Sequence, residues 1–422
     1  MLKLPLAWMK YIALGMAGGL LSACTHGPGF SRPLPSVTGV HDIAFRQTLS
    51  ALLDNSVLEG NQIRTLNNGD EIFPAMLADI RSARKSINLE TFIFDQGVIP
   101  EQFVDALSAK ARAGVHVRVI LDALGASMSF PYHRQLRDSG VELALYHRIW
   151  WPDLQRYNHR THRKLLVIDG TVGFIGGAGI SDVWRGRASR PEEWRDVQYR
   201  AEGPVVTQLQ GAFLNNWLKM KREVLQGRDY FPALKKAGPF AAQVFYSSPR
   251  HQRYSAELMY HLAIASARHT LRLTNPYFLP DRELTDALCA AAQRGVLVQI
   301  LMPGKHNDQP AVKRASRRRW AKLLAAGVQL YEYQPTMLHS KLLVVDDYFV
   351  SIGSTNLDPR SLRLNDEANM NIFNTTFAAS QVVLFKTDLR KSTPVTIKSN
   401  KQPMSAAEAL LQTAETPLEP QL

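Results

Sequence analysis

The sequence predicts an α/β protein made of two homologous halves, at roughly residues 61–235 and 236–392. Short apolar, β-branched runs alternate with helical stretches that end at glycine. This alternation is typical of a mostly parallel or mixed sheet covered by helices. The same landmarks then recur in the same order later in the chain, which indicates a duplicated unit.

Each half is expected to open with a buried strand, at residues 87–94 and 271–279. A helix that ends at Gly114 or Gly295 follows, because glycine is the usual residue just beyond a helix C-terminus. A second strand and a second helix complete the pattern before a further strand. They are the strands 115–121 and 296–301 and the helices that end at Gly140 and Gly327.

The clearest repeat is a polar signature followed by an apolar run and an aspartate. It reads His162-Arg163-Lys164-Leu165-Leu166-Val167-Ile168-Asp169 in the first half. The second half has His339-Ser340-Lys341-Leu342-Leu343-Val344-Val345-Asp346. A glycine-rich segment follows each copy and lets the backbone approach its neighbours closely.

Composition limits the function classes. The 422 residues are enough for two or three domains, and 45% hydrophobic with 21% charged residues argues against a disordered, collagen-like or many-pass membrane chain. Fifty Lys and Arg against 37 Asp and Glu give a net charge of +13, which indicates an anionic partner such as phospholipid or nucleic acid. Two cysteines exclude a disulfide framework and zinc sites built from cysteine pairs.

The first 24 residues are predicted to be a targeting segment. Two lysines precede a short apolar run that ends in Leu21-Ser22-Ala23-Cys24, which resembles a bacterial lipoprotein signal with Cys24 as the lipidated residue. The expectation is a lipoprotein anchored to a membrane on its extracytoplasmic side. A plain secretory signal or a retained signal anchor are the alternatives. Residues 25–60 are predicted to be a linker and residues 393–422 a polar tail.

The duplicated signature fits chemistry at phosphorus. Residues two apart on a strand face the same side, so each His projects together with its Lys. Lysine supplies a positive charge for a phosphate oxygen, and histidine attacks phosphorus or moves a proton near neutral pH. Two copies at an interface would place two His and two Lys around one phosphate, so one His attacks while the other serves the leaving group. This reaction requires neither a metal nor a cofactor.

These paired signatures resemble the two HKD motifs of the phospholipase D superfamily, and in particular its bacterial cardiolipin synthase-like branch. The resemblance covers about residues 61–392 and includes Leu89-Glu90-Thr91-Phe92-Ile93, Trp194-Arg195-Asp196 and Asn275-Pro276-Tyr277-Phe278. It implies two phospholipase D-like α/β/α sandwich domains, related by a pseudo-twofold axis, with the active site at their interface.

The resemblance also implies roles for the site residues. His162 would be the nucleophile and His339 the general acid, although the near-symmetry of the halves leaves the reverse assignment open. Lys164 and Lys341 would bind the phosphate. Asn356 would add an amide to the same phosphate.

Further residues would support the histidines. Asp196 and Glu367, which lie 34 and 28 residues after His162 and His339, would hydrogen-bond these imidazoles and fix their tautomers, as the third member of a catalytic triad does. The HKD aspartates, Asp169 and Asp346, are interpreted as structural groups that order the turn and the neighbouring lysine. One departure concerns Gly179, which stands where the family has Asn, so the first half would lack one phosphate-facing amide.

The leading functional interpretation is a phosphatidyltransferase of the cardiolipin synthase type. A phosphatidyl group would move to a phosphohistidine and then to phosphatidylglycerol at an anionic phospholipid membrane, with no obligate protein partner. A phospholipase D that hydrolyses phospholipid to phosphatidic acid uses the same intermediate. Two further alternatives are a nucleic-acid phosphodiesterase and a non-enzymatic lipid-binding protein.

Two surface features have an open interpretation. The basic run Lys313–Arg319 is either a solvated helix face or a contact for anionic head groups. Trp150 and Trp151 either enter the membrane interface or pack in the core.

Overall fold

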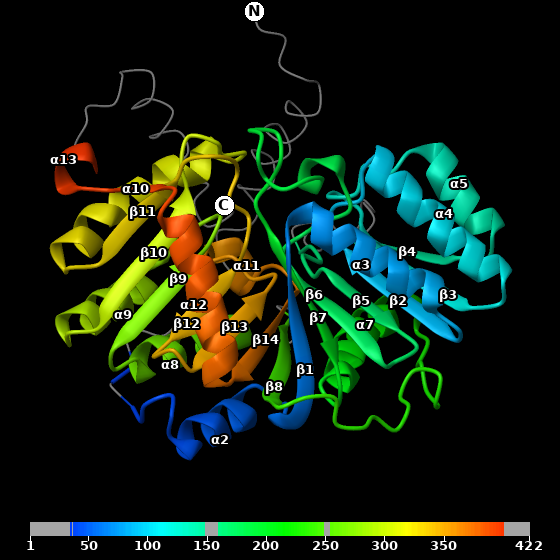
Figure 1. The fold of residues 1–422 in the computed structure, drawn as a ribbon, viewed down its shortest axis with the longest axis horizontal. Coiled ribbons are helices and arrows are strands. Elements are labelled where there is room, and N and C mark those ends of the chain that lie inside the picture. Colours follow the sequence, from blue (N-terminus) through cyan, green and yellow to red (C-terminus); the bar gives the residue numbers. More distant parts are fainter. Residues whose placement is uncertain (1–33, 36, 148–158, 249–253, 401–422) are drawn as a thin grey trace, which may run out of the picture.

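Two similar α/β halves lie side by side in the computed structural model, which describes residues 34–35, 37–147, 159–248 and 254–400 (Figure 1). Cys24, Trp150 and Trp151 fall outside these residues. Across the described ranges, no helix has the length and apolar character needed to cross a membrane.

All strands belong to one sheet, and its order repeats about the centre. The order is β15-β11-β10-β9-β12-β13-β14-β8-β1-β7-β6-β5-β2-β3-β4. The first-half strands are β1 (Leu58–Asn67), β2 (Ser86–Thr91), β3 (His116–Asp122), β4 (Glu142–Tyr146), β5 (Leu165–Ile168), β6 (Val172–Gly176) and β7 (Val197–Glu202). The second-half strands are β8 (Phe240–Ser247), β9 (Thr270–Thr274), β10 (Leu297–Pro303), β11 (Gln329–Tyr333), β12 (Leu342–Val345), β13 (Phe349–Gly353), β14 (Glu367–Phe373) and β15 (Ser392–Pro394).

The strand order explains the sequence repeat. Reading outward from the centre, β1-β7-β6-β5-β2-β3-β4 matches β8-β14-β13-β12-β9-β10-β11 strand for strand. The halves join through the antiparallel pair β1 and β8, where Asn61 faces Phe240. The pairs β2–β3 and β3–β4 of the first half and β9–β10 and β10–β11 of the second are parallel, and the remaining pairs are antiparallel, so the sheet is mixed, as the sequence predicts.

Helices cover both faces of the sheet in each half (Figure 1). On β3, Val119 packs in the cluster that contains Phe103, whereas its neighbour Ile120 packs with Phe213 and Trp217 from the opposite side. This alternation is the period-two pattern of a strand buried on both faces. The helices of the first half are α3 (Asn68–Ser82), α4 (Val98–Arg112), α5 (Phe130–Asp138), the 3-10 turn η2 (Asp182–Trp184) and α7 (Val206–Lys221). Those of the second half are α8 (Ser255–Ser266), α9 (Arg282–Gln293), α10 (Pro310–Ala325), α11 (Pro359–Arg363), α12 (Thr375–Leu389) and α13 (Ile397–Asn400).

The expected α/β/α sandwich and the helix ends agree with the structure. Gly114 and Gly295 follow α4 and α9 with φ of +86° and +91°, the left-handed conformation that ends a helix. The strand expected over 271–279 is shorter, because β9 ends at Thr274 and the chain then turns through Asn275.

Residues 25–60 are not simply the linker that the sequence predicts. They contain helix α2 (Ile43–Leu52), which Asp42 caps by accepting from the amide of Ala44, and the first residues of β1. Phe45 and Leu49 of this helix are buried in the core of the second half, and the Phe45 ring lies 5.3 Å from that of Phe349. The segment before the first half therefore packs on the second half (Figure 1).

The predicted tail also begins with ordered structure. β15 pairs antiparallel with β11 at the edge of the sheet, and α13 packs on α10. No strand is predicted here because β15 is only three residues long, too short to show an alternating pattern. Residues 401–422 lie outside the described residues.

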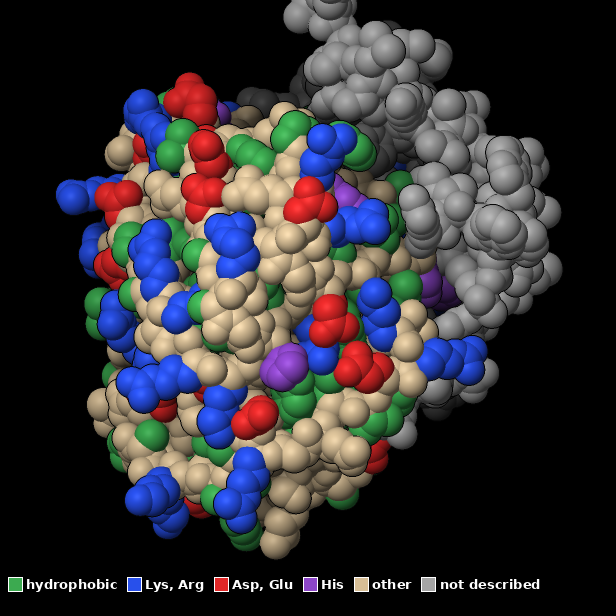
Figure 2. All heavy atoms as spheres, turned by 90° about the vertical axis from the view of Figure 1, so that its right-hand side faces the viewer, with side chains coloured by type: hydrophobic (Ala, Val, Ile, Leu, Met, Phe, Trp, Pro, Cys, Tyr) green, Lys and Arg blue, Asp and Glu red, His purple; other side chains and the backbone are tan. Residues whose placement is uncertain are grey.

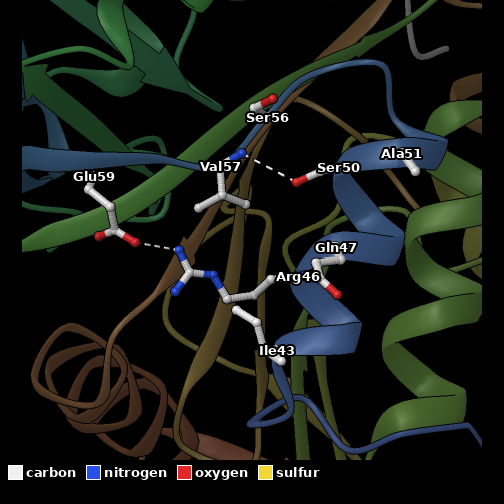
Figure 3. A pocket seen from close by; sticks show the side chains of 8 residues that line it. All are labelled: Ile43, Arg46, Gln47, Ser50, Ala51, Ser56, Val57 and Glu59. Carbon is white, nitrogen blue, oxygen red and sulfur yellow. Dashed lines mark hydrogen bonds and ion pairs between the residues drawn. The ribbon is translucent and has the colours of Figure 1, made fainter.

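Two surface features are separate from the sheet centre. A shallow hollow between α2 and the start of β1 is lined by Ile43, Gln47 and the ion pair Arg46–Glu59 (Figure 3). On the face of the first half in Figure 2, Lys and Arg side chains are spread out with Asp and Glu among them. The basic excess is therefore not gathered into one patch on this face.

Candidate active site

The two His-Lys pairs occupy equivalent places in the two halves. His162 and Lys164 lie in the extended segment that enters β5, and His339 and Lys341 lie in the segment that enters β12. All four side chains are buried, with at most 8% of any residue exposed. The apolar run behind each pair is fully buried as a strand, and this anchors the polar end of the strand.

His162 is held by a carboxylate of the other half. Its Nδ1 lies 2.9 Å from Oε1 and 3.0 Å from Oε2 of Glu367, the first residue of β14. Because a carboxylate only accepts, Nδ1 carries the proton and Nε2 keeps a free lone pair. Ser354 donates its hydroxyl to Oε2 of Glu367 at 2.5 Å and fixes the carboxylate.

His339 is held in the same way from the first half. Its Nδ1 lies 2.7 Å from Oδ2 of Asp196, which directly precedes β7. Asp196 also accepts from the indole of Trp184 at 2.9 Å and from the amide of Val197 at 2.8 Å. The two carboxylates therefore hold the histidines, but the predicted pairing within each half is wrong, because each carboxylate binds the histidine of the opposite half.

Burial and neighbouring charge keep both histidines neutral. Burial lowers the pKa of His162 to about 4, with Glu367 opposing the shift and both lysines adding to it. Burial, followed by the charge of Lys341, lowers the pKa of His339 to about 3. Lys164 contributes to the lowered pKa of His339 and Lys341 to that of His162, so the two motifs form one electrostatic unit.

The lysines are also destabilised in their charged forms. Burial, with repulsion from Lys341, lowers the pKa of Lys164 to about 7. Burial lowers the pKa of Lys341 to about 8, although Asp196 and Glu367 favour its charged form. Each ammonium donates to the carbonyl of its own histidine, and that of Lys341 lies 3.1 Å from Nε2 of His339. Two buried ammonium groups that repel each other favour the binding of an anion between the halves.

The HKD aspartates are structural, but they do not order the lysines as predicted. Asp169 accepts from the amides of residues 84–86 ahead of β2, and Asp346 accepts from the amides of residues 268–270 ahead of β9. Both residues have positive φ, 51° and 49°. Each carboxylate therefore holds a turn at the far end of its strand, away from the lysine at the near end.

The environments of the two halves differ at Gly179. A Cβ at this position would lie 2.9 Å from Cβ of Ile93 and 3.0 Å from the ring of Trp184, so the indole already fills the space. In the second half, Asn356 is buried, and its Oδ1 has no hydrogen-bond partner among the described residues. The second half thus has a buried amide at this position, whereas an indole occupies the related region of the first half.

Aromatic side chains that sequence reasoning did not assign surround His339. The rings of Trp194, Trp184 and Tyr277 lie 5.0, 5.4 and 5.9 Å from its ring. His162 has one such neighbour, Phe92, at 5.2 Å. Trp194, Tyr277 and Phe92 stand in segments that carry the family resemblance, but no pattern assigned them to a histidine, because the packing unites segments distant in sequence. Over the described ranges, no group of three His, Cys, Asp or Glu side chains is placed to hold a metal ion.

Comparison with known proteins agrees with this architecture. The family described as "Cardiolipin synthase, PLD-like domain" matches residues 76–183 and 260–389. Cardiolipin synthase 2 of Bacillus cereus is 37% identical over 338 residues, which are 79% of this chain and 66% of that protein. The chain thus spans just under two thirds of that relative. Cardiolipin synthase of Geobacillus sp. is 35% identical over 368 residues, 86% of this chain and 73% of that protein.

Solved structures support the fold. Phosphatidylserine synthase of Haemophilus influenzae superposes with a TM-score of 0.68 at 15% identity, over 90% of this chain and 100% of that one. At this identity the likeness concerns the fold alone. With the duplicated sheet, the paired His-Lys motifs and these matches together, the chain belongs to the cardiolipin synthase family of phospholipase D-like proteins.

Proposed function

We propose that the protein is a phosphatidyltransferase that makes cardiolipin from two molecules of phosphatidylglycerol through a phosphohistidine. The observation that carries the proposal is that each of two buried His-Lys pairs has its histidine held by a carboxylate of the other half, so that Nδ1 carries the proton and Nε2 is unprotonated. The names of the relatives supply the substrate class.

In the first step, Nε2 of His162 attacks the donor phosphorus. The P–N bond forms, the P–O bond to glycerol breaks, and His339 gives its Nε2 proton to the leaving oxygen. A bound phosphate diester offsets the charges of Lys164 and Lys341, so the pKa of His339 rises on binding and the ring can carry this proton. The two ammonium groups and the amide of Asn356 stabilise the charge on the non-bridging oxygens.

In the second step, the acceptor hydroxyl of phosphatidylglycerol gives its proton to His339. The new P–O bond forms as the P–N bond breaks, which releases cardiolipin and regenerates His162. The near-complete burial of both pairs supports transfer over hydrolysis, because limited access of water favours an acceptor held at the site.

We further propose that the protein works at an anionic membrane surface to which Cys24 tethers it as a lipoprotein. The lipobox-like Leu21–Cys24 and the net charge of +13 support this placement. Growth with labelled palmitate should label the wild-type protein but not a Cys24→Ser variant. An unlabelled wild type would contradict the lipoprotein anchor.

The reaction is tested with labelled phosphatidylglycerol in vesicles, for wild type, His162→Ala and His339→Ala. Cardiolipin and glycerol are expected from the wild type only. Phosphatidic acid as the main product would replace the transferase with a phospholipase D. No lipid product, together with cleavage of DNA, would favour the phosphodiesterase alternative.

A further inference from the structure

Each histidine is also bound to the opposite half through its backbone. The amide of His162 donates to the carbonyl of Asp366 at 2.9 Å, and the amide of His339 donates to the carbonyl of Arg195 at 2.7 Å. Asp366 and Arg195 directly precede the carboxylates Glu367 and Asp196. A histidine and its carboxylate are thus aligned by one short backbone contact between the halves, made twice.

The side chain before each carboxylate is fixed by a buried ion pair. The guanidinium of Arg195 binds the carboxylate of Asp388 on α12, with Nη2 and Oδ2 3.1 Å apart and both side chains at most 7% exposed. Nζ of Lys219 on α7 lies 2.9 Å from Oδ2 of Asp366, which also accepts from the hydroxyl of Tyr146 at 2.7 Å. We call these pairs the Arg195 clasp (Arg195–Asp388) and the Asp366 clasp (Asp366–Lys219).

The two clasps occupy equivalent positions with opposite polarity. Lys219 is the fourteenth residue of α7 and Asp388 the fourteenth residue of α12, and each reaches across to the residue before the other half's carboxylate. In the Arg195 clasp, the residue before the histidine-binding carboxylate Asp196 is a cation. In the Asp366 clasp, the residue before the histidine-binding carboxylate Glu367 is an anion. A pairing of two first halves would set Arg195 against Lys219, and a pairing of two second halves would set Asp366 against Asp388.

Because the charges of the clasps are removed from water, their pairing affects the stability of the assembly. A buried charge that loses its partner is costly, and like charges placed opposite each other cost more. Burial lowers the pKa of Lys219 and Asp366 opposes that shift, so Lys219 depends on Asp366 to stay charged. Arg195 is also tied to Asn68 and to the carbonyl of Asp196, so its position sets the path of the chain into the catalytic carboxylate.

From this geometry we propose that the clasps are positioning elements: the Arg195 clasp aligns Asp196 with His339, and the Asp366 clasp aligns Glu367 with His162. Their opposite polarity makes unlike halves the preferred partners in the pseudo-twofold assembly. The effect on turnover rests on the proposed function; the effect on the histidines does not.

The test uses the full-length protein with ¹⁵N-labelled histidine and measures kcat, KM and the pKa of each histidine by NMR. The variants are Asp388→Asn, Lys219→Met, Asp388→Arg and the charge exchange Arg195→Asp with Asp388→Arg. Glu59→Gln serves as the control, because it breaks the partly exposed pair with Arg46 on the surface, away from the site. The resonances of His162 and His339 are assigned with the corresponding His→Gln variants.

Asp388→Asn should lower kcat about 10²-fold, the loss typical of a misplacement of about 1 Å, with KM within about twofold. The pKa of His339 should fall further below its ordinary value of about 6.5, because Asp196 opposes the lowering by burial, while the pKa of His162 stays unchanged. Lys219→Met should instead lower the pKa of His162 and leave that of His339 unchanged. Asp388→Arg should be worse than Asp388→Asn, and the charge exchange should recover at least about tenfold of the loss.

The positioning role would be overturned if the pKa values of both histidines shift equally in both Asp388→Asn and Lys219→Met, or if neither pKa shifts in either variant. A charge exchange no more active and no more heat-stable than Asp388→Arg would overturn the polarity argument. If the wild type makes no lipid product, the proposed function fails, but the NMR shifts still decide the inference. If Asp388→Arg does not fold, the milder Asp388→Asn and Lys219→Met decide it.

Discussion

Oε1 of Glu367 lies 2.9 Å from Nδ1 of His162, although 205 residues separate them and they belong to opposite halves. The relation is reciprocal, since Asp196 of the first half binds His339 of the second. Neither half therefore contains a complete histidine-carboxylate pair. Joining two copies in one chain makes the site a property of the interface.

The crossed pairing predicts which step each carboxylate supports. Asp196→Asn should remove the charge that stabilises the protonated His339 ring, which serves the leaving group, and Glu367→Gln should leave His162 in the wrong tautomer for attack. A loss in kcat of about 10²–10⁴-fold is expected for each, by analogy with triad carboxylates. A phosphatidyl donor with a p-nitrophenol leaving group needs no acid, so it should restore the first step of Asp196→Asn but not of Glu367→Gln. Rescue of Glu367→Gln alone would reverse the assigned roles.

The pKa values of the lysines predict a loss of kcat/KM in mildly alkaline solution. Lys164 and Lys341, with pKa of about 7 and 8, lose their charge as the pH rises through these values, and binding of the anionic phosphate weakens. On the acid side the histidines stay neutral down to about pH 4. The kcat/KM profile of the wild type should therefore fall above pH 7–8. A Lys164→Arg variant that retains activity should keep its rate up to about pH 8, where Lys341 loses its charge, and an unchanged alkaline limb would contradict this assignment.

The buried lysines should cost stability. The folded-state pKa of Lys164 is about 7 against 10.5 unfolded, so the unfolded chain binds more protons between these values and folding is opposed most below pH 7. Lys164→Met removes this cost and should raise the free energy of unfolding by about 1–4 kcal/mol at pH 6, while abolishing turnover. The gain should shrink as the pH approaches 10.5. Lys322→Met, at an exposed lysine, should show no comparable gain in urea unfolding.

Asp169 should affect stability through the turn before β2. Asp169→Ala leaves the amides of residues 84–86 without their acceptor, which should cost about 1–3 kcal/mol in urea unfolding. Asp169→Asn keeps an acceptor oxygen and tolerates the φ of 51°, so it should lose less. KM should stay unchanged in both variants. A selective loss of phosphate binding would instead show that Asp169 acts on Lys164.

Even the smallest side chain at position 179 should reduce both stability and activity. Gly179→Ala places Cβ 2.9 Å from Cβ of Ile93 and 3.0 Å from the ring of Trp184, so the indole must move. A loss of about 1–3 kcal/mol in stability is expected, together with lower activity because Trp184 also binds Asp196. The pair Gly179→Ala and Trp184→Phe should not recover the activity. A fully active and stable Gly179→Ala would show that the indole is free to shift.

Features that are local in the chain could be predicted from the sequence. The hydrophobic periodicity and the helix-ending glycines predict the alternation of strands and helices. The repeated His-x-Lys signature identifies Lys164 and Lys341 as site residues. Short or isolated elements such as β15 and α2 were missed, because three residues carry no period and α2 has its core contacts in the second half.

The sequence by itself determined the duplication, the α/β class and the identity of the histidines, lysines and carboxylates. Only the tertiary structure decided that the carboxylates cross between halves, that Trp184 fills the space beside Gly179, and that Arg195 and Asp366 meet opposite charges. The physical reason is that these contacts join residues far apart in the chain, some of them more than a hundred positions apart. Their register is set where β1 meets β8 and where short backbone contacts join the halves, and no local pattern records it.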